Sequence, residues 1–235
     1  MKQKATLRNS GRPFVFSNFA MTADGKIAFA KDNFIPFGST RDHRHMMELR
    51  ATADAVLSGA RTVEVTETVL GNGGEKFRRQ RLKNGLSEFP LRIIASGSGS
   101  IDPDANIFKK HFSPVIILTT ERISKAGLKS LRRVADVKIF GEKELDFHAA
   151  LRWLRKEWNV RRLLCEGGGA LHGTLIHAGL VDELHLTLCP RIFGGRHAPT
   201  IADAQGFLKL AESAQFRLAS ARAKGDELFA VFTAK

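Results

Sequence analysis

Short, continuous apolar runs alternate with segments of helical periodicity through the middle of the chain. The runs at 91–96 and 114–120 are apolar almost throughout, which is typical of strands covered on both faces of a sheet. Between 146 and 159, apolar residues recur at helical spacing behind Asp146, a residue suited to cap the helix. This strand and helix alternation predicts an α/β domain with a mostly parallel sheet.

The flanking segments extend the same pattern. The sequence predicts a strand over 12–20 with a turn at Asp24-Gly25, and a helix from an N-cap at Ser39 to about Ala53. The Gly-rich, basic segment from Gly71 to Pro90 is interpreted as a long loop. Further strands are predicted at 54–60, 137–141 and 161–166, and helices from about 61, over 121–133 and after 167.

The last third of the chain changes to a period of two. Leu184, Leu186 and Leu188 alternate with polar residues, and the segments 216–222 and 227–235 flank a turn, which predicts an antiparallel hairpin. No linker divides the pattern, so we expect a single domain over 1–235 with a flexible tail at 1–11.

Composition places the chain among ordinary globular proteins. Apolar residues make up 43% and charged residues 26% of the 235 positions, which excludes a disordered body. No apolar run approaches the roughly 18 residues of a membrane span, and the first residues lack the apolar stretch of a secretory signal. We therefore expect a cytoplasmic protein that does not enter a membrane.

The charge balance of 37 Lys plus Arg against 24 Asp plus Glu gives a net charge of +13. Its densest cluster runs from Lys76 to Lys83. Three interpretations stay open: a solvated segment, a nucleic-acid contact, or a positive field that attracts an anionic small molecule. Of these, nucleic-acid binding is the least favoured.

Glycines after a buried strand are the strongest local signal for chemistry. Glu166 ends the strand, and Gly167, Gly168 and Gly169 lead into a helix, so bare main chain and free N–H groups favour an anion such as a diphosphate. The spacing does not meet the G-x-G-x-x-G fingerprint, and a tight turn is the alternative.

The cysteine and histidine positions give little support for metal or thiol chemistry. Cys165 and Cys189 form no Cys-x-x-Cys pair and lie in apolar stretches, as buried hydrophobes do. His43 and His45 stand two apart and would face different sides of a helix, so we expect no metal site.

Four segments, in order, resemble the reductase domain of riboflavin biosynthesis. This family comprises the C-terminal domain of the bacterial bifunctional deaminase-reductase and the free-standing archaeal and fungal diaminopyrimidine reductases. The segments are RPFVFSNFAMTADGKIA, LRATADAVLSGARTV, LLCEGGGALHGTLIHAGLVDELHLTLCPRIFGG and HAPTIADAQGF.

The resemblance implies a dihydrofolate-reductase-like fold, a homodimer, NADPH as cofactor and a small phosphorylated substrate. The implied reaction is hydride transfer to C1′ of the ribosylamino group of a diaminopyrimidinone ribosyl 5′-phosphate. It implies Glu166, Asn18 and Asp24 as catalytic residues, and Arg50 together with Glu166 as substrate contacts. The implied cofactor-binding residues are Ala20, Thr62, Thr66, Ser96, Gly167, Gly168, Gly169, Ala170 and Leu171.

The segments that the family uses for the substrate depart from the family pattern in this chain. The family's Asp-Asp/Asn-Pro segment is replaced by residues 64–70, where Thr66 stands for a cofactor-contacting aspartate, and Pro36-Phe37-Gly38 replaces Trp-Ile-Thr. Arg78, Arg79 or Arg81 would then supply the missing phosphate contact, or the substrate is a different pterin or pyrimidine. Arg122, after the strand ending at Thr120, favours NADPH over NADH.

Overall fold

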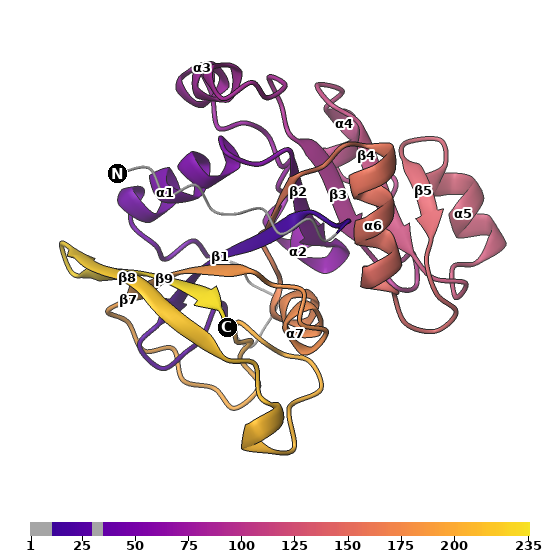
Figure 1. Ribbon diagram of the computed structural model, residues 1–235. Coiled ribbons are helices and arrows are strands. Elements are labelled where there is room, and N and C mark those ends of the chain that lie inside the picture. Colours follow the sequence, from indigo (N-terminus) through magenta and orange to yellow (C-terminus); the bar gives the residue numbers. More distant parts are fainter. Residues whose placement is uncertain (1–10, 30–34) are drawn as a thin grey trace.

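In the computed structural model, which describes residues 11–29 and 35–235, these described residues fold around one nine-stranded sheet (Figure 1). The strands are β1 (Phe14–Thr22), β2 (Ala55–Gly59), β3 (Leu91–Ala95), β4 (Val115–Thr119), β5 (Asp136–Ile139), β6 (Arg162–Cys165), β7 (Glu183–Cys189), β8 (Phe216–Lys224) and β9 (Glu227–Ala234). Across the sheet they lie in the order β5-β4-β3-β2-β6-β1-β7-β9-β8.

Neighbouring strands from β5 to β7 are all parallel, and β9 and β8 add an antiparallel hairpin at one edge. The predicted fold class, a mostly parallel sheet that ends in a C-terminal antiparallel hairpin, is confirmed.

Helices cover both faces of the parallel strands. They are α1 (Thr40–Arg50), α2 (Ala60–Thr66), α3 (Glu75–Lys83), α4 (Asn106–Lys109), α5 (Lys125–Leu131), α6 (Phe147–Glu157) and α7 (Gly169–His177), with a short 3₁₀ turn η1 at Leu210–Glu212. Successive side chains of a strand point to opposite faces. Val15 packs with the buried side chains of α6 and α7, whereas the next residue, Phe16, packs with those of α1, α2, α4 and α5.

Two predicted helix caps are confirmed. The Ser39 hydroxyl accepts hydrogen bonds from the backbone N–H groups of Arg41 and Asp42, and the Asp146 carboxylate accepts one from Ala149. These bonds satisfy donors that the first turn of a helix leaves free. Helix α1 ends at Arg50, earlier than the predicted Ala53, because Thr52 N donates to Leu49 O in a turn toward β2.

The segment 71–90 is not a long loop, so that prediction is wrong. It contains α3, whose Phe77 packs against Met47 of α1 and against Ala51, which directly follows that helix. The helix has only two apolar side chains in nine residues, so it lacks an apolar stripe. The packing of Phe77 holds it in place instead. In Figure 1, α3 lies beyond α1, away from the sheet. The short elements α4 and η1 were also not predicted.

Within the described residues, no helix combines the length and the apolar character needed to cross a lipid bilayer. The predicted tail at 1–11 falls, apart from Gly11, outside the described residues.

Candidate active site

The strand order reverses around β6, and the residues that follow β2 and β6 meet there. The chain places β2 to β5 successively outward, then returns to insert β6 between β2 and β1. Ligands of open α/β sheets bind beyond the carboxyl ends of the strands at such a reversal. At this point Gly59 N donates to Gly167 O over 2.7 Å, and Glu166 N donates to Leu57 O over 3.0 Å.

The glycine turn after β6 presents main chain without side chains. Gly167 has a φ of 99°, a left-handed conformation that favours glycine, and its peptide bond to Gly168 is cis. A Cβ at Gly167 would lie 2.9 Å from the Phe19 ring, and one at Gly168 would lie 2.9 Å from Thr62 Oγ1. Thr62, in the first turn of α2, is therefore next to the turn, as its predicted role requires.

Helix α7 begins directly at this turn. Its N-cap, Gly168, has no side chain to accept hydrogen bonds from the first-turn N–H groups at Gly169, Ala170 and Leu171. Such a helix start favours an anion through both its N–H groups and the helix dipole. The bare turn and the uncapped helix fit the diphosphate of a dinucleotide.

The other predicted cofactor residues lie on or just after β1, β3 and α2. Ser96 is buried just after β3, and the Arg122 guanidinium lies against Gly97, where a Cβ would stand 2.7 Å from Nη2. Ala20 faces Thr187 across the β1–β7 pair. Thr66 lies one helical turn beyond Thr62, and its hydroxyl donates to Thr62 O over 2.8 Å, so that group is engaged within α2.

Glu166 and Arg50 form a buried, two-pronged ion pair. Arg50 Nε and Nη2 each donate to a Glu166 carboxylate oxygen over 2.6 Å, and Arg50 Nη1 donates to Gly71 O. Paired charges in a fork geometry hold each other in a fixed orientation. The structure thus brings together the predicted catalytic carboxylate and the predicted substrate arginine, and links α1 to the end of β6.

Asp24 is tied into the turn after β1. Its carboxylate accepts hydrogen bonds from Thr22 Oγ1 at 2.6 Å, Phe193 N at 3.2 Å and Gly194 N at 2.7 Å. The bond from Thr22, with those from the backbone, lowers the pKa of Asp24 to about 2. Through these contacts Asp24 connects the turn after β1 to the segment at Phe193 and Gly194.

A polar patch lies between α1 and the strands β1 and β7. It consists of Asn18, Asp42, His45, His185 and Thr187. Asn18 faces His185 across the β1–β7 pair, Asp42 lies beside Thr187, and the His45 ring centroid is 5.4 Å from that of His185. The patch therefore combines an amide, a carboxyl, a hydroxyl and two imidazoles.

The patch is rich in unsatisfied groups. Among the described residues, six buried side-chain polar atoms have no hydrogen-bond partner, and four are Asn18 Oδ1, Asp42 Oδ1, His185 Nδ1 and Thr187 Oγ1. Buried polar groups are normally paired, so an ordered water or a ligand would supply the partners of this cluster. Only Asn18 of this patch was predicted; the polar side of the alternation in β7 was the available signal for His185 and Thr187.

His172 fixes α7 against β1. Its Nδ1 lies 2.6 Å from Ile201 O, which can only accept, so Nδ1 carries the proton and Nε2 accepts from Ser17 Oγ at 2.9 Å. Burial lowers the pKa of His172 to about 4, so this histidine is neutral and structural.

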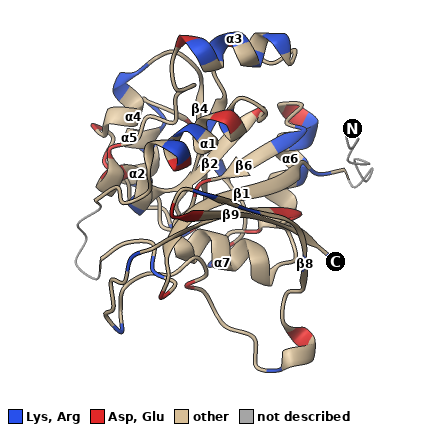
Figure 2. Cartoon of the chain, turned by 90° about the vertical axis from the view of Figure 1, so that its left-hand side faces the viewer, with Lys and Arg blue, Asp and Glu red and all other residues tan. Residues whose placement is uncertain are grey.

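The basic residues of α3 do not behave as one group. Of the three arginines offered for the substrate phosphate, Arg81 is fully buried and donates to Arg50 O, Ala53 O and Ser87 O, which removes it as an alternative. Arg78 and Arg79 pair with Glu75. Figure 2 shows Lys and Arg along α3 as well as at scattered sites elsewhere.

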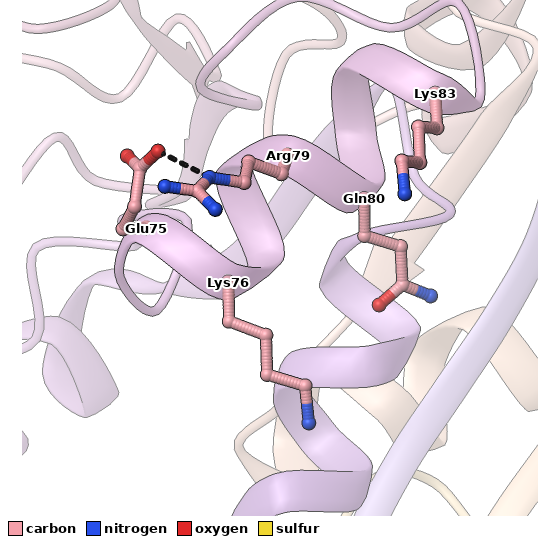
Figure 3. A pocket seen from close by; sticks show the side chains of 5 residues that line it. All are labelled: Glu75, Lys76, Arg79, Gln80 and Lys83. Carbon is pink, nitrogen blue, oxygen red and sulfur yellow. Dashed lines mark hydrogen bonds and ion pairs between the residues drawn. The ribbon is translucent and has the colours of Figure 1, made fainter.

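A surface hollow of about 490 Å³ lies beside α3, and of the residues that the sequence singled out only Arg79, a candidate for the phosphate contact, lines it. Figure 3 shows Lys76, Gln80 and Lys83 extending from the helix into this region while Arg79 turns to Glu75. Elsewhere in the described ranges, no three His, Cys, Asp or Glu side chains gather as metal ligands would.

Comparison with known proteins identifies relatives of this chain. Residues 13–230 match the model of the RibD C-terminal domain. The chain is 32% identical over 198 residues to the 2,5-diamino-6-ribosylamino-4(3H)-pyrimidinone 5′-phosphate reductase of Archaeoglobus fulgidus, covering 84% of this chain and 90% of the relative.

Two solved structures share the fold. A pyrimidine reductase-like protein from Corynebacterium diphtheriae superposes with a TM-score of 0.77 at 20% identity, covering 95% of this chain and 92% of that one. A Thermotoga maritima deaminase and 5-amino-6-(5-phosphoribosylamino)uracil reductase gives a TM-score of 0.71 at 21% identity, covering 95% of this chain but 57% of that one. The fold inferred from the sequence resemblance is confirmed.

Proposed function

This chain belongs to the RibD C-terminal domain family, and we propose that it is an NADPH-dependent reductase of riboflavin biosynthesis acting on a diaminopyrimidinone ribosyl 5′-phosphate. The observation that carries the proposal is the side-chain-free turn at Gly167–Gly168, which directly follows the buried Glu166–Arg50 ion pair. A cofactor site and a charged substrate site therefore adjoin at one strand end.

The cofactor half is assigned to the turn and its neighbours. Gly167 to Leu171 hold the diphosphate through main-chain N–H groups, with Thr62 beside them and Ala20 toward the reactive ring. Ser96 and Arg122 are assigned to the adenosine end, where a guanidinium suits the 2′-phosphate of NADPH. When bound, the dihydronicotinamide supplies a hydride. Thr66 is given no cofactor contact, because its hydroxyl donates to Thr62 O.

The substrate half is assigned to Arg50, Glu166 and Asn18. The opened ribosylamino group presents a C1′=N bond, which takes a hydride at carbon and a proton at nitrogen to give the ribitylamino product. Glu166 stabilises the positive charge that develops as the imine is protonated, and the two hydrogen bonds from Arg50 fix the orientation of that carboxylate. Asp24 keeps the turn beyond β1 in place.

Purified protein mixed with NADPH and the substrate tests the proposal. We expect NADPH absorbance to fall as a ribitylamino product with two added hydrogens appears by mass spectrometry. NADPH binding without turnover would favour the alternative, a reductase of the same fold acting on a different pterin or pyrimidine. That alternative is kept because residues 64–70 depart from the family pattern.

Glu166→Gln separates chemistry from cofactor binding. Because the carboxylate is assigned to stabilise the positive charge that develops on the substrate, we expect kcat to fall about 100-fold or more. The Kd for NADPH should stay unchanged. Glu48→Gln, which removes an exposed carboxylate from α1, is the control and should keep full activity. Equal losses in turnover and cofactor affinity, or no loss in either, would contradict the assignment.

We also propose a homodimer that acts in the cytoplasm. The edge strand β8 is largely exposed on both faces, and Leu208, Leu210 and Leu218 are 92%, 89% and 55% exposed. Leucines exposed on and just before an edge strand are normally covered, and a second copy of the chain would cover these. The free, buried Cys165 and Cys189 suit a reducing compartment.

A further inference from the structure

The segment 71–90 contacts α1 at the end of the helix that carries Arg50. Where the segment begins, Gly71 O accepts a hydrogen bond from Arg50 Nη1 over 3.0 Å. After α3, Asn84 Nδ2 donates to Ala51 O over 3.0 Å. Since α3 lies on the side of α1 away from the sheet, these contacts hold the helix end from outside (Figure 1). The segment therefore touches both the side chain of Arg50 and the backbone that follows it.

Shorter hydrogen bonds to the same helix end come from Arg81, whose side chain is fully buried. Its Nη1 donates to Arg50 O over 2.6 Å and to Ala53 O over 2.7 Å. Its Nε donates to Ser87 O over 2.8 Å, which ties the guanidinium to the chain after α3. The last carbonyl groups of a helix have no intrahelical donor, and a planar guanidinium supplies several donors in a fixed geometry. Arg81 thus fixes the backbone at Arg50 relative to α3.

Arg50 extends from that fixed backbone to Glu166. Its side chain is 8% exposed, and its Nε and Nη2 each donate to one carboxylate oxygen over 2.6 Å. A two-pronged pair allows little variation in geometry, so movement of the helix end that carries Arg50 would misalign it. A misplacement of about 1 Å near a reacting centre can cost on the order of 100-fold in rate. The orientation of the Glu166 carboxylate therefore depends on how firmly the end of α1 is held.

We propose that Arg81 is a positioning residue for the reaction: by holding the Arg50 carbonyl it keeps the Arg50 guanidinium, and through it the Glu166 carboxylate, in the productive orientation. The assignment rests on the proposed function and adds to it a residue that is too deeply buried to touch the substrate. It gives the segment 71–90 a part in the reaction, although none of the assigned substrate or cofactor contacts comes from that segment.

Arg92, near the start of β3, provides a matched control. It is 2% exposed, its Nη1 donates to Ile107 O, and its Nη2 donates to Ser113 O. Burial lowers the pKa of Arg81 and of Arg92 to about 10, so the two guanidinium groups have comparable surroundings. Both hold backbone carbonyls, but only Arg81 holds the carbonyl of an assigned site residue.

Methionine removes the donors at either position and keeps a long, unbranched side chain. Among variants shown to be folded by circular dichroism, Arg81→Met should lower kcat about tenfold with an unchanged Kd for NADPH. Arg92→Met should keep kcat within about twofold of the native value. In a Glu166→Gln background, Arg81→Met should cost less than about twofold more, because the carboxylate that Arg81 positions is already gone. Losses that multiply in the double variant would mean that Arg81 acts through general stability.

A second measurement needs neither substrate nor cofactor. The Arg50 Nε–H, held by Glu166, should exchange slowly with water, and its ¹H–¹⁵N resonance is assigned by its loss in Arg50→Lys. Arg81→Met should speed this exchange by about tenfold or more, whereas Arg92→Met should leave it unchanged. If Arg81→Met fails to fold, Arg81→Lys is the second variant. It keeps the buried cation without the planar fork, and it should speed the exchange by about threefold or more.

These outcomes separate the positioning role from the proposed function. Unchanged Nε–H exchange in a folded Arg81 variant, equal acceleration by Arg92→Met, or multiplying losses in the double variant overturns the assignment. Faster exchange in Arg81→Met, in a protein whose native form does not oxidise NADPH with the substrate, leaves Arg81 as the residue that holds the Arg50–Glu166 pair and rejects the proposed reductase activity.

Discussion

The Arg122 guanidinium extends over the main chain of Gly97, beside the buried Ser96 at the end of β3. If it pairs with the 2′-phosphate of NADPH, Arg122→Ala should weaken NADPH binding by about tenfold or more and leave NADH binding unchanged. Fluorescence titration with both dinucleotides measures this. Arg133→Ala, which removes an exposed arginine after α5, is the control, and equal effects of the two variants would reject the pairing.

His172 makes a separate prediction about stability and pH. Its pKa is about 4 in the folded protein and about 6.5 when unfolded, so protons bind the unfolded chain more readily between these values. The contribution of His172 to the free energy of unfolding is therefore fully present above pH 6.5. It is lost as the pH falls toward 4, by about 3 kcal/mol.

Replacing the imidazole tests this linkage. His172→Asn should lower the free energy of unfolding at neutral pH and flatten its decline between neutral and pH 5, as measured by urea unfolding. His148→Asn, at an exposed position on α6, should keep the native pH profile. An unchanged decline in His172→Asn would place the pH dependence in other groups.

Individual site residues could be predicted unevenly from the sequence. Gly167 to Gly169 and Glu166 stand together after a buried strand, so a local pattern was enough to find them. Asp42 and Thr187 lie far apart in the sequence and meet only because α1 packs over β7. No local pattern encodes that meeting, although the alternation in β7 placed His185 and Thr187 on one side.

At the scale of elements, the strands of the parallel sheet and the large helices followed from periodicity, whereas α3 did not. An amphipathic helix normally shows an apolar stripe, and α3 replaces it with Phe77 and the buried guanidinium of Arg81. Arg81 satisfies carbonyls at the end of α1, including Arg50 O and Ala53 O. A charged residue that acts as a core anchor cannot be told from a solvated one by composition.

Arg81→Ala should therefore destabilise the protein by about 2–4 kcal/mol, because it leaves buried carbonyls unpaired and opens a cavity. Thermal unfolding measures the loss. Arg79→Ala removes an equal charge from the exposed face of the same helix and should leave stability unchanged. Similar losses in the two variants would mean that the α3 segment is not anchored through Arg81.

For the molecule as a whole, the strand order decides where the site lies, and local patterns do not specify it. The sequence predicted a strand after each helix but not that β6 inserts between β2 and β1. This insertion brings Gly59 against Gly167, and the crossover through α1 brings Arg50 to Glu166. The family resemblance supplied the fold, and the unsatisfied groups of the polar patch became visible only with the chain packed.

The two edges of the sheet differ, and that difference tests the proposed homodimer. The edge strand β5 packs beside α5, whereas β8 is largely exposed on both faces and follows the exposed Leu208 and Leu210. Leu218→Lys places a charge on β8, and burying it between two copies would be costly, so this variant should sediment as a monomer. Ile139→Lys adds the same charge on β5, where the side chain is also exposed, and should leave the dimer intact. Dissociation by Ile139→Lys alone would move the interface to the opposite edge, and a native protein that sediments as a monomer would remove it altogether.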